Sequence, residues 1–143
     1  MALMCAGEEL VESNGGKGRL HVLIVEDNPD CASSLALLLR RYGFTVDLAA
    51  DGPGALSAVA ASPPDAALLD IGLPGEMDGW ELAKRIKAAT RPRQPLLIAV
   101  SGFGREDDRH RSTVSGIDLH LTKPVDPDLL KSVLLRFQGI LYD

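Results

Sequence analysis

Short apolar runs alternate with longer amphipathic stretches from Leu20 almost to the end of the chain. The apolar runs predict five strands, at residues 20–25, 44–49, 66–71, 95–100 and 117–122. The stretches between and after them carry apolar residues three and four positions apart, the period of an α-helix. They predict helices at residues 28–42, 53–61, 78–89, 104–115 and 126–138. Five strand–helix units predict one α/β domain.

Local signals support both kinds of element. Asn28 followed by Pro29, and Asp126 followed by Pro127, have the pattern of an N-cap residue with proline at the first helical position. Residues 22–25 and 96–100 are continuously apolar instead of alternating, which is typical of strands covered on both faces. We therefore expect a doubly wound five-stranded parallel sheet with helices on both faces.

Composition and charge narrow the class of protein. The 143 residues have a formal net charge of −5, which disfavours binding to nucleic acid or to anionic membrane surfaces. No apolar run is long enough to span a membrane, and the first residues lack the basic start of a signal peptide. The two cysteines, Cys5 and Cys31, cannot form a disulfide framework, so we expect a reduced, cytoplasmic protein.

The chain divides into three parts. Residues 1–18 show no apolar period and end in Ser13-Asn14-Gly15-Gly16-Lys17-Gly18, so they predict a flexible leader or a remnant of an expression vector. Residues 19–138 form the predicted domain, and residues 139–143 are expected to be a C-terminal tail. Few residues follow the last predicted helix, so we expect no output module in this chain.

Polar residues follow four of the predicted strands. Glu26 and Asp27 follow the first strand, Asp70 lies near the end of the third, Ser101 follows the fourth, and Lys123 follows the fifth. Each feature alone is most simply an N-cap, a turn or a loop. In open α/β sheets, however, ligands bind outside the carboxyl ends of the strands, so these residues are expected to converge. Their conjunction predicts a functional site.

The residue types at this edge indicate phosphoryl transfer. Clustered carboxylates repel one another, and a hard cation removes that conflict. Mg²⁺ prefers oxygen ligands and often binds one or two carboxylates together with a phosphate oxygen. Lys123 and Ser101 would then face the phosphoryl group, and Asp70 is the best candidate for the nucleophile because Glu26 and Asp27 are better placed as a metal pair.

The chain resembles the receiver domain of two-component response regulators over roughly residues 20–138. The motifs that carry the resemblance are Val25-Glu26-Asp27-Asn28, Leu68-Leu69-Asp70-Ile71-Gly72-Leu73-Pro74, Met77-Asp78-Gly79, Val100-Ser101-Gly102 and Leu121-Thr122-Lys123-Pro124. The resemblance implies a sheet of strand order 2-1-3-4-5. It also implies that a histidine kinase or a histidine phosphotransfer protein is the partner that donates the phosphoryl group.

The resemblance assigns a role to each matching residue. Asp70 is implied to be the phosphoacceptor, and Glu26, Asp27, Asp70 and the backbone carbonyl of Gly72 are implied to hold Mg²⁺. Lys123 is implied to pair with the acyl phosphate, and Ser101 to hydrogen-bond a phosphoryl oxygen. The Lys123–Pro124 bond is expected to be cis. The resemblance further implies that a downstream protein binds the face made by the fourth helix, fifth strand and fifth helix.

Histidine and glycine stand at positions that distinguish this chain within the family. His120 occupies the position from which, in many receivers, an aromatic side chain swings inward with the switch; a partly exposed strand histidine is the simpler interpretation. His21 and His110 show no metal-ligand spacing with His120, so a zinc site is not expected. Gly72 and Phe103 place no polar side chain beside the expected path of a hydrolytic water, which predicts an effect on the lifetime of the phosphoryl group.

The loop that leads to the third predicted helix is one residue longer than the usual receiver pattern. Glu76 looks like the inserted residue, so partner contacts there can differ from those of other receivers.

Five basic residues cluster in the third predicted helix and the loop that follows it: Lys84, Arg85, Lys87, Arg91 and Arg93. A solvated helix face explains them most simply, and recognition of an acidic partner is the alternative, because no aromatic residues interleave for base stacking.

Two enzymatic or cofactor-binding alternatives are weaker. A Mg²⁺-dependent aspartyl-phosphate phosphatase of the dehalogenase type also uses a strand-end aspartate, but it carries a second aspartate where this chain has Gly72. A dinucleotide-binding domain needs a Gly-x-Gly-x-x-Gly motif after the first strand, where Glu26-Asp27-Asn28-Pro29 stands instead. We therefore expect a phosphoacceptor domain and not a turnover enzyme, either as a stand-alone response regulator or as a segment of a hybrid histidine kinase.

Overall fold

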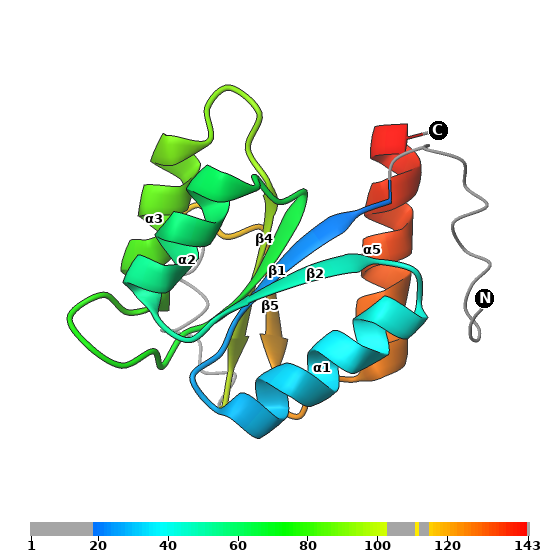
Figure 1. Ribbon diagram of the computed structural model, residues 1–143, viewed down its shortest axis with the longest axis horizontal. Coiled ribbons are helices and arrows are strands. Elements are labelled where there is room, and N and C mark those ends of the chain that lie inside the picture. Colours follow the sequence, from blue (N-terminus) through cyan, green and yellow to red (C-terminus); the bar gives the residue numbers. More distant parts are fainter. Residues whose placement is uncertain (1–18, 103–110, 112–114, 143) are drawn as a thin grey trace.

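The computed structural model describes residues 19–102, 111 and 115–142, which form a five-stranded parallel sheet between two layers of helices (Figure 1). The strands are β1 (His21–Val25), β2 (Thr45–Ala49), β3 (Ala66–Asp70), β4 (Leu96–Ser101) and β5 (Leu119–Thr122). The helices are α1 (Pro29–Arg41), α2 (Gly52–Ala61), α3 (Gly79–Ala89) and α5 (Pro127–Tyr142). The sheet order is β2-β1-β3-β4-β5, which confirms the predicted fold.

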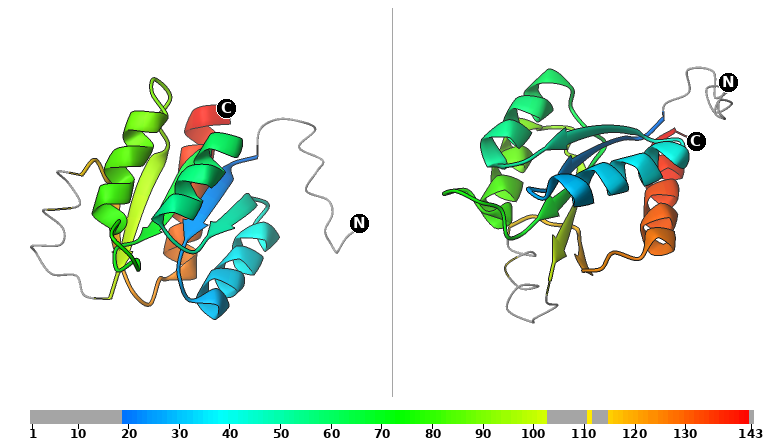
Figure 2. Two further views of the ribbon diagram at one scale, coloured as in Figure 1. Left: turned by 60° about the vertical axis from the view of Figure 1, so that its left-hand side comes forward. Right: turned by 60° about the horizontal axis from the view of Figure 1, so that its bottom comes forward.

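Each face of the sheet has its own apolar core. Helices α2 and α3 cover one face and α1 and α5 cover the other, as two views show (Figure 2). Alternate residues of β1 serve the two cores: Leu23 and Val25 pack toward α2 and α3, whereas Val22 and Ile24 pack toward α1 and α5. All four of these side chains are at most 1% exposed. The continuous apolar run of β1 is therefore explained by burial on both sides.

Helix starts agree with the expected capping chemistry. The side chain of Asn28 accepts hydrogen bonds from the backbone N–H groups of Asp30 and Cys31, which starts α1 directly after the acidic pair. Asp78 caps α3 in the same way by accepting from Glu81 N. Both caps lie at the carboxyl edge of the sheet, so the helices begin where the polar residues of the predicted site gather.

Strand β5 is shorter than predicted. Residues 117 and 118 do not belong to it, although Ile117 is buried. The carboxylate of Asp118 accepts a hydrogen bond from Leu97 N at 2.8 Å, and Asp118 N donates to Leu97 O at 2.9 Å. Because a side chain takes up the backbone donor of Leu97, the regular ladder begins only at Leu119, which pairs with Ile98.

Helix α5 is longer than predicted. It continues past residue 138 to Tyr142, so residues 139–142, expected as part of a tail, are helical. Leu141 and Tyr142 pack against the apolar core on the α1 side, and the Tyr142 hydroxyl donates to the carboxylate of Asp65. These tertiary contacts outweigh the helix-weakening effect of Gly139. Of the predicted helix 104–115, only Arg111 and Ser115 lie among the described residues, and Arg111 is helical.

Candidate phosphoryl-transfer site

Strand register brings the predicted site residues to one edge of the sheet. Strand β3 lies between β1 and β4, with Leu69 opposite Val25 and Asp70 opposite Val100. Strand β4 pairs with β5 so that Ser101 lies opposite Thr122. Thr122 directly precedes Lys123 in the chain. The expected convergence of polar residues at the carboxyl ends is therefore realised in the fold.

Asp70 is the most deeply placed carboxylate of the site. Its residue surface is 8% exposed, and its Oδ1 accepts a hydrogen bond from Gly72 N at 3.0 Å. Its Oδ2 lies 3.2 Å from Nζ of Lys123. One oxygen is thus oriented by the backbone and the other by a cation, which fixes the carboxylate at the sheet edge.

Gly79 packs directly against the backbone of Asp70 and Ile71. A Cβ atom at residue 79 would lie 2.7 Å from the carbonyl oxygen of Asp70 and 2.7 Å from Cα of Ile71. Gly79 N also donates to the carbonyl oxygen of Ile71. The first residue of α3 therefore supports the backbone of the acceptor strand, a role that reasoning from sequence overlooked although Asp78-Gly79 was among the motifs.

Glu26 and Asp27 complete a three-carboxylate cluster. One carboxylate oxygen each from Glu26, Asp27 and Asp70 lie within 4.8 Å of one another. Asp27 is exposed, whereas the Glu26 side chain is only 12% exposed and accepts a hydrogen bond from Asn28 N. Closely spaced oxygen donors with excess negative charge are the donor set that a hard divalent cation such as Mg²⁺ prefers, so the cluster fits such an ion.

Burial and charge shift the ionisation of two residues here. Partial burial raises the pKa of Glu26 above its ordinary value of 4.5; the Asp70 charge adds to this rise, and the Asn28 hydrogen bond opposes it. Partial burial by itself would lower the pKa of Lys123, but its hydrogen bond to Asp70 and the charges of Asp70 and Glu26 raise it. Lys123 therefore stays an ammonium group beside both carboxylates, with Nζ 3.4 Å from Glu26 Oε1.

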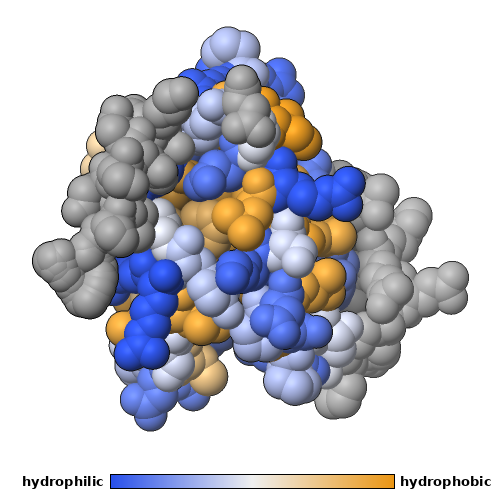
Figure 3. All heavy atoms as spheres, turned by 90° about the vertical axis from the view of Figure 1, so that its right-hand side faces the viewer, coloured by the Kyte–Doolittle hydropathy of each residue, from blue (hydrophilic) through white to orange (hydrophobic). Residues whose placement is uncertain are grey.

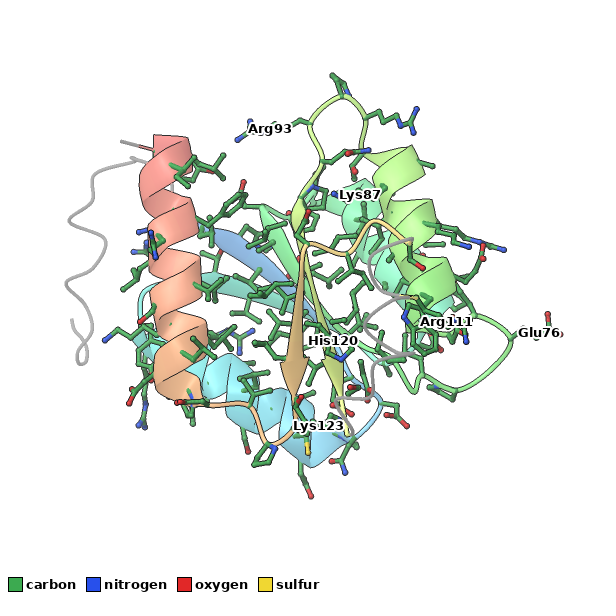
Figure 4. All side chains as sticks on the ribbon, turned by 180° about the vertical axis from the view of Figure 1, so that it is seen from behind. Glu76, Lys87, Arg93, Arg111, His120 and Lys123 are labelled. Carbon is green, nitrogen blue, oxygen red and sulfur yellow. The ribbon has the colours of Figure 1, made fainter. Side chains whose placement is uncertain are left out.

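Ser101 and His120 face each other on neighbouring strands. The Ser101 hydroxyl oxygen lies 2.8 Å from His120 Nε2, and Ser101 is 7% exposed. Figure 4 shows His120 on β5 toward the same end of the molecule as Lys123. The structure thus links the two residues directly, whereas sequence reasoning placed both near a switch without predicting their contact.

Other sequence-predicted features lie outside this cluster. Glu76 is exposed on the loop before α3 and points away from the body of the molecule (Figure 4). Phe103 and His110 lie outside the described residues. The Lys123–Pro124 peptide bond is cis, and so is Arg91–Pro92, which the sequence gave no reason to single out. His21 contacts Thr45 and Asp47 and lies apart from the site.

Arg111 contacts the start of α3, which reasoning from sequence did not predict. Its guanidinium carbon lies 3.9 Å from the ring centroid of Trp80, and its Nη2 lies 3.8 Å from the Asp78 carboxylate. The arrangement is a cation–π contact beside a partly exposed ion pair. It joins residue 111 to the start of α3.

A parallel 2-1-3-4-5 sheet with an acidic cluster, a lysine and a hydroxyl at its carboxyl edge defines a receiver-type fold. The response regulator receiver domain family model matches residues 22–135. Transcriptional regulatory protein TcrA of Mycobacterium tuberculosis is 36% identical over 132 residues, which cover 87% of this chain and 51% of TcrA. An uncharacterized 14.6 kDa protein of Leptolyngbya boryana is 35% identical over 109 residues, or 76% of this chain and 82% of that protein.

Solved structures agree with this result. The crystal structure of a CheY-like receiver domain protein from Methanospirillum hungatei superposes with a TM-score of 0.76 at 29% identity, covering 87% of this chain and 99% of that one. The chain therefore belongs to the response regulator receiver domain family, whose members are signalling domains of two-component systems. It spans about half the length of TcrA. No helix among the described residues is long and apolar enough to cross a membrane.

Proposed function

We propose that Asp70 accepts a phosphoryl group from a phosphohistidine of a histidine kinase or a histidine phosphotransfer protein. A carboxylate oxygen of Asp70 attacks phosphorus, the P–N bond to imidazole breaks, and the imidazole leaves with the bond electrons. The observation that carries this proposal is the geometry of Asp70, a buried carboxylate held between Gly72 N and the Lys123 ammonium beside two further carboxylates. The Gly72 position lacks the second acid that a dehalogenase-type phosphatase uses, so we propose no turnover activity on external substrates.

We propose that Glu26, Asp27, Asp70 and the backbone carbonyl of Gly72 hold Mg²⁺. The ion supplies charge neutralisation for the phosphoryl oxygens as they approach the carboxylates. The three carboxylates within 4.8 Å of one another support this assignment. Lys123 then pairs with the acyl phosphate in place of its present contact with Asp70, and Ser101 donates its hydroxyl to a phosphoryl oxygen.

We propose that the phosphohistidine partner docks beside Asp70 on an apolar groove. The groove has a volume of about 550 Å³ and lies between α1 and the segment after β5, with Leu35, Leu38 and Val125 in its lining. Asp70 and Lys123 line the same groove, so a helix seated there would bring a histidine to the acceptor. Figure 3, which views the molecule from the right-hand side of Figure 1, shows apolar patches interspersed with polar side chains on the surface.

We propose that the phosphorylated domain signals through the face that carries β5 and α5. A carboxylate that becomes an acyl phosphate gains charge and acceptor oxygens, and nearby groups rearrange to satisfy them. The contact between Ser101 and His120 supports this route because His120 lies on β5, at the proposed face. The receiving protein is either a separate chain or a further part of the same polypeptide, and the protein acts in the cytoplasm.

Intact mass after incubation with acetyl phosphate and Mg²⁺ tests the acceptor. Wild type should gain one phosphoryl group, and Asp70→Asn or removal of Mg²⁺ by a chelator should abolish the gain. Asp51→Asn is the matched control, because asparagine keeps the helix cap that Asp51 forms at α2. Unmodified wild type under these conditions would refute the phosphoacceptor assignment.

Phosphotransfer kinetics test the docking groove. Leu38→Gln should slow transfer from a phosphohistidine donor protein while leaving phosphorylation by acetyl phosphate unchanged. Leu37→Gln is the control, because Leu37 lies next to it on α1, is 53% exposed and does not line the groove. Equal transfer rates for the two variants would contradict this docking surface.

A further inference from the structure

A second groove lies at the opposite, amino-terminal edge of the sheet. It has a volume of about 1040 Å³ and is lined by residues 62–65 after α2, residues 91–95 after α3, and the C-terminal turn of α5. We call it the amino-end groove. None of the proposed phosphoryl-transfer residues lines it, and Figure 4 shows Arg93 at one end of the molecule and Lys123 at the other.

Positive charge is concentrated in the amino-end groove. Arg19, Arg85, Arg91 and Arg93 line it, although the whole chain carries a formal net charge of −5. Asp65 is the one carboxylate among its described lining residues. The Asp65 side chain is 13% exposed and already accepts hydrogen bonds from His21 N and the Tyr142 hydroxyl. Arg85 forms an ion pair of 2.9 Å with Glu81, so the positive charge that lacks a close carboxylate comes from Arg91 and Arg93.

The two arginines of the loop after α3 are accessible to a ligand. Within the described part of the chain, Arg91 is exposed and forms no hydrogen bond or ion pair. Arg93 is 75% exposed, and its only ion pair there is a long one of 3.8 Å to Asp65. Its side chain points from the loop toward the side on which α5 lies (Figure 4). Both guanidinium groups can thus bind an anion without breaking a strong contact.

The rest of the lining indicates the kind of anion. Aliphatic and aromatic side chains, including Leu56, Val59 and Phe137, line the groove beside the arginines. Four prolines also line it: Pro63, Pro64, Pro92 and Pro95. Proline has no backbone N–H, so these loops offer few of the convergent donors that cradle a single phosphate group. Dispersed arginines beside apolar side chains instead match a chain that alternates carboxylates with apolar residues.

We propose that the amino-end groove binds an acidic polypeptide segment of a partner protein. The arginines pair with its carboxylates, and its apolar side chains contact the apolar lining. Because the groove and Asp70 lie at opposite edges of the sheet, this contact can persist while Asp70 gains or loses a phosphoryl group. The proposal stands independently of the phosphoacceptor function. It also gives Arg91 and Arg93 a role distinct from that of Arg85, which pairs with Glu81, and of Lys87, which pairs with Asp118.

Fluorescence anisotropy on the full chain tests the proposal. The probe is a labelled peptide of sequence Gly-Glu-Leu-Glu-Glu-Leu-Glu-Gly, and the same peptide with glutamine in place of glutamate is the control ligand. Wild type should bind the acidic probe at low salt, and affinity should fall as salt screens the charges. Arg91→Glu should weaken binding about tenfold, whereas Arg41→Glu, an equal charge change at an exposed residue outside the groove, should weaken it less than about twofold.

Three results would overturn this assignment. The first is absence of binding to wild type at low salt. The second is an equal loss for Arg41→Glu and Arg91→Glu, which would indicate nonspecific attraction. The third is binding that appears only after Glu8, Glu9 and Glu12 are replaced by glutamine, which would assign the groove to this chain's own acidic segment and not to a partner. Phosphoryl uptake by Arg91→Glu, measured by intact mass, should equal that of wild type in every case.

Discussion

The hydroxyl oxygen of Ser101 lies 2.8 Å from Nε2 of His120, so the last residue of β4 and the second residue of β5 share a hydrogen bond beside Asp70. A serine hydroxyl has one proton to donate. When His120 Nε2 carries no proton, Ser101 is the donor to the ring, and donating that proton to a phosphoryl oxygen on Asp70 instead breaks or reverses the bond with His120. The contact therefore makes His120 a reporter of the chemical state of Asp70.

Side-chain NMR of His120 should detect this change. We expect its ring resonances to shift when beryllofluoride and Mg²⁺ are added as a phosphoryl analogue, because the Ser101 contact is altered. In Ser101→Ala the shift should be largely lost, while phosphoryl uptake at Asp70 persists. His21, which contacts Thr45 and Asp47 away from the site, serves as the internal control. A full-sized shift of His120 in Ser101→Ala would contradict the coupling.

Lys123→Met should destabilise the domain and make it more dependent on Mg²⁺. The ammonium group lies 3.2 Å from Asp70 and 3.4 Å from Glu26, and its removal leaves those carboxylates without a cation. We expect a loss of about 1 kcal/mol at neutral pH, since the Lys123 side chain is 40% exposed and water screens the pair. Urea unfolding with and without Mg²⁺ measures both effects. Lys84→Met, at an exposed lysine, should change neither the stability nor its dependence on Mg²⁺. If Mg²⁺ stabilised Lys123→Met no more than wild type, the proposed interaction of Lys123 with the three-carboxylate cluster would be contradicted.

Gly72→Asn should shorten the lifetime of the phosphoryl group. A Cβ atom at residue 72 would lie 3.8 Å from Oδ1 of Asp70, which is an ordinary contact, so a side chain fits there and lies next to the acceptor. A carboxamide at this position can orient an attacking water, and we expect dephosphorylation several-fold faster than in wild type. Gly72→Ala provides the control for added bulk. Decay of the phosphorylated mass peak gives the rate, and equal rates for the asparagine and alanine variants would disprove the role of the amide.

Gly79→Ala should impair both stability and phosphoryl uptake. Its Cβ would lie 2.7 Å from backbone atoms of Asp70 and Ile71, and neither can rotate away as a flexible side chain could. We expect a loss of about 1–3 kcal/mol, typical of overpacking, together with slower phosphorylation because the acceptor strand shifts. Gly102→Ala is the control, since no atom of the described residues, apart from the chain neighbours of Gly102, lies within 4 Å of a Cβ there. Chemical denaturation and acetyl phosphate kinetics measure the two effects, and wild-type behaviour of Gly79→Ala would contradict the packing.

Tyr142→Phe should lower the free energy of unfolding at neutral pH, but not at a pH above the pKa of Tyr142 in the folded protein. Burial, with the charge of Asp65 and the hydrogen bond to it, raises the pKa of Tyr142 above 10.0. A raised folded-state pKa means that this contribution is complete below pH 10 and is lost as pH rises through the higher folded value. We expect a difference of about 1 kcal/mol near pH 8 that disappears above the folded pKa. Urea unfolding across this range measures it, and a pH-independent difference would exclude the hydrogen bond as its cause.

Absorbance titration of the same pair of proteins provides a second measurement. The chain has two tyrosines, so the difference between wild type and Tyr142→Phe isolates the ionisation of Tyr142. The midpoint should lie above 10.0, with circular dichroism showing that the protein remains folded. A midpoint at or below that value in the folded protein would contradict the burial of the hydroxyl against Asp65.

Reasoning from sequence succeeded where a local pattern had a direct physical meaning. Continuous apolar strands, N-cap residues and polar residues after the strands predicted the sheet and the edge at which Asp70 and Lys123 meet. It failed at the start of β5 and the end of α5, where groups distant in sequence decide the boundaries. The Asp118 carboxylate accepts a hydrogen bond from Leu97 N, and the Tyr142 hydroxyl donates one to Asp65. No local pattern at residues 117–118 or 139–142 encodes those partners.

Local patterns along the chain are enough to predict the class of the protein and the residue types of its site. Apolar periodicity dictates the elements, and the carboxyl ends of parallel strands must share one edge, so Glu26, Asp27, Asp70 and Lys123 converge in any chain with this pattern. Tertiary structure alone decided which groups touch. Strand register placed Ser101 against His120, and the tertiary fold brought Arg19 into one groove with Arg85, Arg91 and Arg93. Such contacts depend on the relative positions of whole elements, which no local segment specifies.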